Sequence, residues 1–179
     1  MENGCSVCKR CGGGNCVSKI PVFSSLDFNE QDKIHSLIIR KKYRKGEFLL
    51  MEGDIQESLT ILHHGKVKVF RYTQEDKEQI LYVLSEGDFF GERNLFQKLK
   101  STCFIEALEE TEVCLISDSA FIAFLKNHPE IGEPGGSHTR RLIFQRYPYT
   151  VVYRLKDEAL EIVALAHHSR QPEYWAGRL

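Results

Sequence analysis

The 179-residue chain has no long run of apolar residues and no excess of either charge. No apolar stretch approaches the roughly 18 residues that a membrane-spanning helix needs, so we expect no membrane partner. Lys and Arg number 24 and Asp and Glu number 25, a balance that excludes the strongly basic chains held together by nucleic acid. Residues 1–4 have neither the basic nor the apolar region of a secretory signal. These absences favour a cytoplasmic protein.

Cysteine is rare outside one cluster. Four of the six cysteines lie in the first sixteen residues, namely Cys5, Cys8, Cys11 and Cys16. In a reducing cytoplasm clustered thiols are more often metal ligands than disulfides. Bacterial ferredoxins use a similar run for three ligands of an iron–sulfur cluster and take the fourth from elsewhere. A remote cysteine, Cys103 or Cys114, is therefore predicted to complete the site.

Three interpretations of the cysteines stay open. The first is an iron–sulfur cluster, and the second is a structural zinc site with four thiolates, which the Cys-x2-Cys pairs also suit. The third is a tail whose thiols hold no metal. Cys103 and Cys114 lie in apolar, strand-like stretches, where a cysteine can also be an ordinary core residue.

The pattern of the chain changes twice. Residues 1–19 form a polar, glycine-rich tail, and a helix is expected after Asp27, with Glu30 completing a capping box. Between residues 43 and 117 short apolar strands and turns alternate about every ten residues, which is typical of a β-barrel or sandwich. A second helix is expected from Asp118 to His128.

The glycine-rich segment 132–136 ends this pattern. Strands at 140–144, 149–155 and 160–166 then predict a small antiparallel three-stranded sheet. Residues 1–131 carry 17 basic and 20 acidic side chains, whereas residues 132–179 carry 7 and 5. We therefore expect three parts: a Cys-rich metal-binding tail (1–19), a sensor domain (20–131) and a C-terminal segment (132–179).

Residues 1–131 carry several short motifs in a characteristic order. They are segments 20–26, 45–47, 52–54, 65–69 and 87–92. In this order they resemble the sensor domain of CRP/FNR-family transcription regulators, which is a cyclic nucleotide-binding-like domain. The resemblance implies a mainly β fold, a double-stranded β-helix or jelly-roll barrel with flanking helices.

The resemblance also locates a vestigial nucleotide pocket. Gly91 and Glu92 resemble part of the phosphate-binding turn, and Ser101 and Thr102 stand where nucleotide-binding members carry an Arg-Ser pair. The arginine that would pair with a cyclic phosphate is absent, so cyclic AMP is not the expected ligand.

The cysteines resemble those of the oxygen-sensing FNR branch, which holds a 4Fe–4S cluster with three tail cysteines and one barrel cysteine. The segment 110–114 resembles the one with the fourth ligand, which implies Cys114. The implied ligands are Cys8, Cys11, Cys16 and Cys114, with Cys5 as a surplus metal-ligand candidate. The Cys11-x4-Cys16 spacing is one residue shorter than usual for the branch, which leaves the choice of three tail ligands open.

Regulators of this family continue into a dimerisation helix and a winged helix-turn-helix, and the sequence shows neither. DNA is therefore expected as a partner only through a missing C-terminal domain. A homodimer is the candidate oligomer.

Residues 127–179 resemble the C-terminal half of a RelE/ParE-superfamily toxin, through segments 140–149, 151–154, 164–167 and 170–175. The resemblance implies mRNA cleavage on the ribosome or gyrase inhibition, with an antitoxin, ribosome or gyrase as partner. The candidate catalytic residues are Arg146, Arg154, His167 and Tyr174, within a basic face that also includes Arg141 and Arg170. The family's N-terminal helical hairpin is missing, so one face of the sheet is expected to lack cover.

The chain therefore looks like a chimera joined near residues 128–130. The leading hypothesis is an oxygen- or redox-sensing module rather than an enzyme. A toxin with RelE-type endoribonuclease or gyrase-inhibiting activity is the alternative, and a structural zinc module is the second alternative.

Overall fold

The computed structural model describes residues 17, 20, 23, 26–96, 98–128, 130–143, 149–157, 159–167, 169, 175 and 177. The helical elements are α1 (Phe28–His35), the 3-10 helix η3 (Glu92–Leu95) and α2 (Asp118–Asn127). The strands up to the 3-10 helix are β1 (Ile39–Tyr43), β2 (Phe48–Leu50), β3 (Ile55–Gln56), β4 (Ser58–His64), β5 (Val67–Tyr72), β6 (Glu78–Leu84) and β7 (Phe89–Phe90). The later strands are β8 (Leu99–Lys100), β9 (Phe104–Ala107), β10 (Thr111–Ser117), β11 (Glu133–Pro134), β12 (Arg140–Ile143), β13 (Tyr149–Lys156) and β14 (Ala159–His167).

The described residues pack as two compact units. The roll unit is Leu37–Ser119, and the sheet unit consists of the described residues within Cys5–Ser36 and Ala120–Leu179. Helix α1 and most of α2 thus group with the C-terminal strands, whereas the sequence suggested a division after residue 131. Among the described residues, no helix is long and apolar enough to cross a membrane.

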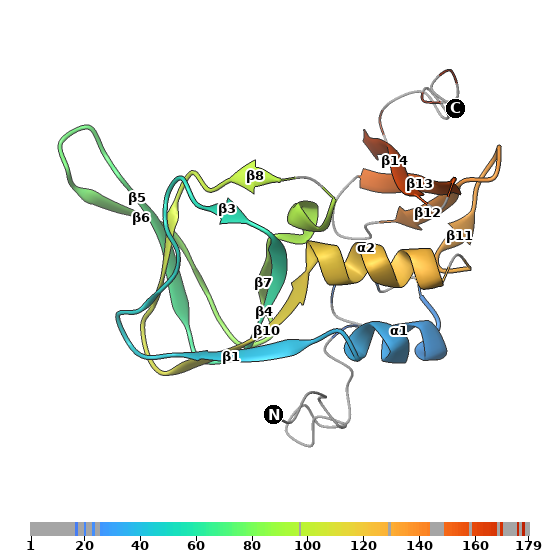
Figure 1. Ribbon diagram of the computed structural model, residues 1–179. Helices are drawn as coiled ribbons and strands as arrows, with labels where there is room; N and C mark the ends of the chain where they lie inside the picture. The colour runs from blue at the N-terminus through green and yellow to red at the C-terminus, as the bar shows by residue number, and fades with distance from the viewer. Residues whose placement is uncertain are drawn as a thin grey trace. The chain divides into compact units, whose positions relative to one another are not determined.

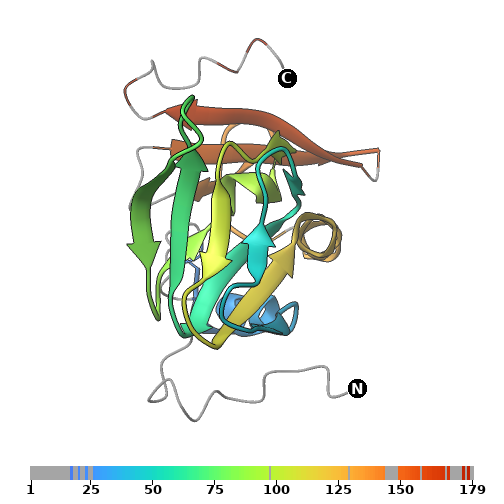
Figure 2. The ribbon, with the colours of Figure 1, turned by 90° about the vertical axis from the view of Figure 1, so that its left-hand side faces the viewer.

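The roll unit consists mainly of two antiparallel four-stranded sheets (Figures 1 and 2). One has the order β1-β10-β4-β7 and the other β2-β9-β5-β6. Both contribute to one apolar core, whose buried members are Tyr43, Leu62, Val67, Val69, Ile105, Ala107 and Val113. This arrangement confirms the mainly β, jelly-roll-like fold class expected from the sequence.

Strand β1 was missed by the sequence pattern. Four of its five residues are exposed, and its Arg-Lys-Lys sequence hides the alternation that marks a half-buried strand. The strand forms because it pairs antiparallel with β10, with Arg40 opposite Cys114 and Lys42 opposite Glu112. Pairing with a buried neighbour thus overrides a weak local signal.

The sheet unit has a four-stranded sheet of order β11-β12-β13-β14 rather than the three strands expected. The extra strand, β11, lies in the segment interpreted as a breaker, and it pairs Glu133 with Arg141 and Pro134 with Arg140. Two-residue strands leave too little pattern for sequence analysis to detect.

Helices α1 and α2 lie beside each other on one side of this sheet (Figure 1). The predicted capping box of α1 is confirmed: Asp27 and Glu30 each accept the other's backbone N–H. The rings of Phe23 and Phe121 lie 5.4 Å apart between centroids, and Tyr153 of β13 is only 1% exposed. The expectation of an uncovered face was therefore wrong, because helices assigned to the barrel pack with the sheet.

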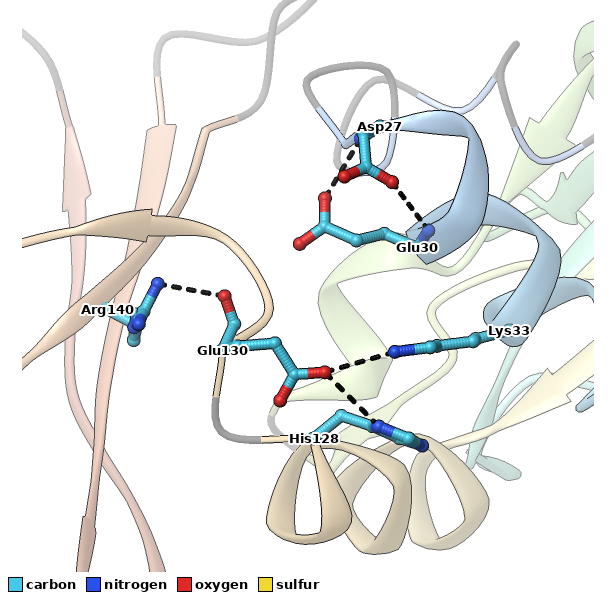
Figure 3. A network of polar contacts seen from close by, with 6 residues as sticks. All are labelled: Asp27, Glu30, Lys33, His128, Glu130 and Arg140. Atoms are coloured by element: carbon cyan, nitrogen blue, oxygen red, sulfur yellow. Dashed lines mark hydrogen bonds and ion pairs between the residues drawn. The ribbon is translucent and has the colours of Figure 1, made fainter.

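The loop after α2 joins these elements (Figure 3). The carboxylate of Glu130 accepts a hydrogen bond from Lys33 of α1 at 3.1 Å and lies 3.3 Å from Nδ1 of His128. Its backbone carbonyl accepts a hydrogen bond from Arg140 of β12 at 2.8 Å, and Tyr153 donates one to the carbonyl of Ile131. The loop carbonyls are thus satisfied by the sheet, as buried backbone requires.

Candidate functional site

Cys114 lies in the middle of β10 and is 1% exposed. Its neighbour Val113 belongs to the core between the two sheets. Side chains alternate along a strand, so Cys114 lies on the opposite, outer face of its sheet. Its cross-strand partners there are Arg40 of β1 and Ile61 of β4.

A charged row adjoins this thiol. The carboxylate of Glu112 in β10 accepts a hydrogen bond from Arg40 Nη1 at 3.2 Å, and it lies 4.0 Å from Lys42 Nζ. Burial, followed by the nearby charge of Arg40, lowers the pKa of His63 below its usual value. The face around Cys114 thus combines a buried thiol, arginine and a histidine that favours its neutral form. Sequence analysis missed Arg40, Glu112 and His63 because their proximity depends on pairing between β1, β4 and β10.

Cys103 has a different environment. It is half-buried and packs against the core of the roll unit, together with residues such as Leu50 and Leu84. Its backbone N–H donates to the hydroxyl of Ser101 at 3.3 Å, and that hydroxyl donates to the carbonyl of Cys103 at 2.7 Å. Cys103 therefore packs against the core inside the roll, whereas Cys114 lies on the outer face of its sheet, a difference that the sequence alone could not decide.

The four tail cysteines, Cys5, Cys8, Cys11 and Cys16, lie outside the described residues. Within the part of the chain that is described, no three His, Cys, Asp or Glu side chains are grouped as metal ligands. A metal centre at Cys114 would therefore need ligands from residues outside this described part.

The turn that resembles a phosphate-binding segment contains a glycine in the left-handed conformation. Gly91 has a φ of +84° and precedes η3. A Cβ at this position would lie 2.6 Å from the carbonyl oxygen of Ser58 and would also collide with Gln56, so the turn requires glycine. The glycine is thus explained by folding alone. The side chain of Glu92 is outside the described set.

Ser101 and Thr102 supply no substitute for the missing arginine. The Ser101 hydroxyl bonds to the backbone of Cys103, and Thr102 is exposed. The roll unit contains a cavity of about 380 Å³ lined by residues of β1 to β4, β7 and β10, including Tyr43 and Thr60. Gly91, Ser101 and Thr102 do not line this cavity.

The arginines of the sheet unit that the structure describes all have partners. Arg140 donates to the carbonyls of Glu130 and Gly132, and Arg154 donates to Glu161 at 2.7 Å. Arg141 lies 3.7 Å from Glu133. Of the basic face that the sequence suggested, Arg141 and Arg154 are thus each paired with a glutamate.

His167, the remaining described candidate, ends β14. Its Nδ1 accepts the backbone N–H of Ser169 at 3.1 Å and lies 2.7 Å from the Ser169 hydroxyl. Arg146, Arg170 and Tyr174 lie outside the described residues. The described part of the sheet unit therefore brings no two of the predicted catalytic side chains into contact.

Comparison with known protein families gives two matches. Residues 40–128 match the cyclic nucleotide-binding domain, and residues 119–172 match the ParE toxin of type II toxin-antitoxin systems, parDE. The two matches overlap over residues 119–128, which include most of α2. This helix thus fits both patterns.

The chain is also similar to known proteins over part of its length. It is 30% identical over 117 residues to "Probable transcriptional regulator flp" of Lacticaseibacillus casei, covering 65% of this chain and 53% of that protein. It is 28% identical over 109 residues to "Cyclic AMP receptor protein" of Thermus thermophilus, covering 61% and 50%. The chain therefore spans about half the length of these two relatives.

A solved structure has the same roll. The N-terminal domain of a transcriptional regulator from Streptomyces coelicolor superposes with a TM-score of 0.61 at 25% identity, covering 64% of this chain and 80% of that one. The fold and the family match define residues 40–128 as a cyclic nucleotide-binding domain. It is a domain of the kind found in CRP/FNR-type transcription regulators.

Proposed function

We propose that the chain is the oxygen- or redox-sensing module of a CRP/FNR-type regulator and that it holds a 4Fe–4S cluster. Cys114 and three thiolates from the tail cysteines, Cys5, Cys8, Cys11 and Cys16, would be the ligands. The observation that carries the proposal is the position of Cys114, a buried residue on the sheet face opposite the roll core.

The chemistry of this face suits a thiolate ligand. A cluster ligand binds as a deprotonated thiolate, and a thiolate gains from nearby positive charge. Arg40 is the cross-strand partner of Cys114, and it shares its charge with Glu112 at 3.2 Å. Cys103, by contrast, packs into the roll core, where a ligand would have to displace apolar side chains. When bound, a cluster would supply an oxygen-labile redox centre, and the chain would supply thiolates and burial.

Cyclic nucleotide binding is less well supported. The phosphate of a cyclic nucleotide needs a charged partner that donates two hydrogen bonds, and neither Ser101 nor Thr102 can act as one. The glycine turn at Gly91 is required by its backbone geometry in any case. The retained turn therefore argues for a shared fold rather than for a shared ligand.

Iron content distinguishes these possibilities. The wild-type chain, Cys114→Ser and the matched control Cys103→Ser would be purified anaerobically and their iron, sulfide and zinc measured. Loss of iron in Cys114→Ser but not in Cys103→Ser is the expected result. Equal iron in all three proteins would refute Cys114 as a ligand. Stoichiometric zinc without iron would refute the cluster and support a structural zinc site instead.

ParE-type toxin activity is the second candidate function. The match over residues 119–172 begins within α2, and α2 packs in the same unit as the matched strands. The unit thus includes helices that the sequence pattern had assigned to the barrel. Against this activity, Arg140, Arg141 and Arg154 are engaged within the unit.

Induction of the chain in growing bacteria tests this second function. Growth arrest by the wild type and relief of that arrest by Tyr174→Ala would support a toxin. Unimpaired growth at high expression would eliminate it and leave the sheet unit as a structural part of the sensor.

A further inference from the structure

Strand β6 is at the edge of its sheet. The order of the sheet is β2-β9-β5-β6, and among the described residues only β5 pairs with β6. The backbone groups of an edge strand that point away from the sheet can pair with another chain, and natural proteins usually protect them with charges or proline. Residues 79–84 of this strand contain no charged residue and no proline.

This edge strand is apolar on both of its faces. Ile80 pairs with Phe70 and Val83 with Lys68, which places both on the outer face, away from the roll core. Tyr82 pairs with Val69 on the core side. The exposed fractions are 55% for Ile80, 47% for Val83 and 52% for Tyr82.

Exposure on both faces restricts the shape of a partner. A helix that packs on a sheet covers one face only, whereas a strand added at the edge covers side chains on both faces and also binds the backbone. The partner that fits β6 is therefore another strand.

We infer that β6 is a self-association edge that pairs antiparallel with β6 of a second copy of this chain. When a charged edge strand pairs with its own copy, like charges come together and oppose the pairing. Residues 79–84 carry no charge, so this repulsion does not arise here. The one charged residue of the strand, Glu78, already binds Lys68 at 2.8 Å. Pairing around the strand centre would place Ile80 opposite Val83 twice, a match of β-branched side chains on the outer face.

Such a contact is closed and two-fold symmetric, because the same strand is used by both copies. The register between β5 and β6 shifts next to Phe70, where Leu81 is the extra residue, and this bulge places Ile80 and Val83 on the same face of the sheet. The inference uses the roll unit alone and does not depend on the iron–sulfur proposal.

Sedimentation velocity over a range of protein concentrations tests the inference with the full chain. The wild type should show a concentration-dependent dimer, and the double variant Ile80→Lys/Val83→Lys should remain monomeric. Met51→Lys is the matched control, since Met51 is 49% exposed outside β6, and it should dimerise like the wild type. All three substituted side chains are exposed, so circular dichroism should show native folding.

Amide hydrogen exchange gives a second measurement. Residues 79–84 should exchange more slowly in the wild type as concentration rises, and their exchange should not depend on concentration in the lysine variant. A wild type that is monomeric at every concentration would overturn the inference. A dimer that survives both lysine substitutions would do the same, because it would use another surface.

Discussion

Replacing Tyr153 with Phe should destabilise the sheet unit through one hydrogen bond. Tyr153 is 1% exposed, and its hydroxyl donates to the carbonyl of Ile131 in the loop after α2. The substitution keeps the ring, so packing changes little, but it leaves a buried carbonyl without its donor. Such an unsatisfied group costs about 1–3 kcal/mol of the free energy of unfolding.

Trp175 provides the assay. It is the one tryptophan of the chain, and it packs against Val152, Val163 and Ala164 of the sheet unit. Its fluorescence during urea unfolding should therefore report this unit, and Tyr153→Phe should lower the unfolding midpoint. Tyr72→Phe is the control, because Tyr72 is 49% exposed in the roll unit, and it should leave the Trp175 transition in place.

The same residue predicts a dependence on alkaline pH. Burial raises the pKa of Tyr153 above the ordinary tyrosine value of 10.0. The folded state therefore holds the phenolic proton more tightly, and stability should fall as the pH rises above about 10. Tyr153→Phe should lack this contribution. An unchanged midpoint in Tyr153→Phe would refute the packing described for the α2 loop.

Two further substitutions test other parts of the structure. Gly132 has a φ of +80°, and a Cβ there would lie 2.7 Å from the carbonyl oxygen of Arg141. Gly132→Ala should therefore lower the free energy of unfolding by more than the roughly 1–2 kcal/mol that a left-handed backbone alone costs. Gly46→Ala is the control: a Cβ there meets nothing within 4 Å, so urea unfolding should show only the smaller cost. Burial, then Arg40, lowers the pKa of His63, so stability should fall as the pH drops below the unfolded value of about 6.5. His63→Gln should flatten this fall in unfolding midpoints measured from pH 5 to 8, and an equally steep fall would exclude His63 as its source.

Local sequence signals predicted some elements well. The capping box at Asp27 and Glu30 and the alternation in residues 67–70 each involve neighbours in sequence, and both elements are present. The charged strand β1 and the two-residue β11 were missed, because each is specified by its partner strand rather than by its own residues. Strands that depend on pairing with a distant segment thus could not be predicted from the local sequence.

The division of the chain was hard to predict for a related reason. Helix α2 fits both family patterns, so sequence assigned it to the barrel, while packing groups most of it with the C-terminal sheet. At the candidate site, Cys114 is predicted as a ligand from the family resemblance, and that prediction is untested. The face on which Cys114 lies follows from the register of β10, and the position of Cys103 follows from packing against the roll core just before β9; no local pattern encodes either.

The central claim is that this chain holds an oxygen-sensitive iron–sulfur cluster. The most direct measurement is the visible absorption spectrum of the wild-type protein, purified under strict anaerobiosis and recorded before and after exposure to air. A bound cluster should give a broad band at about 400 nm that bleaches in air, as is typical of thiolate-ligated clusters. A colourless protein under anaerobic conditions, after attempted reconstitution with iron and sulfide, would contradict the claim.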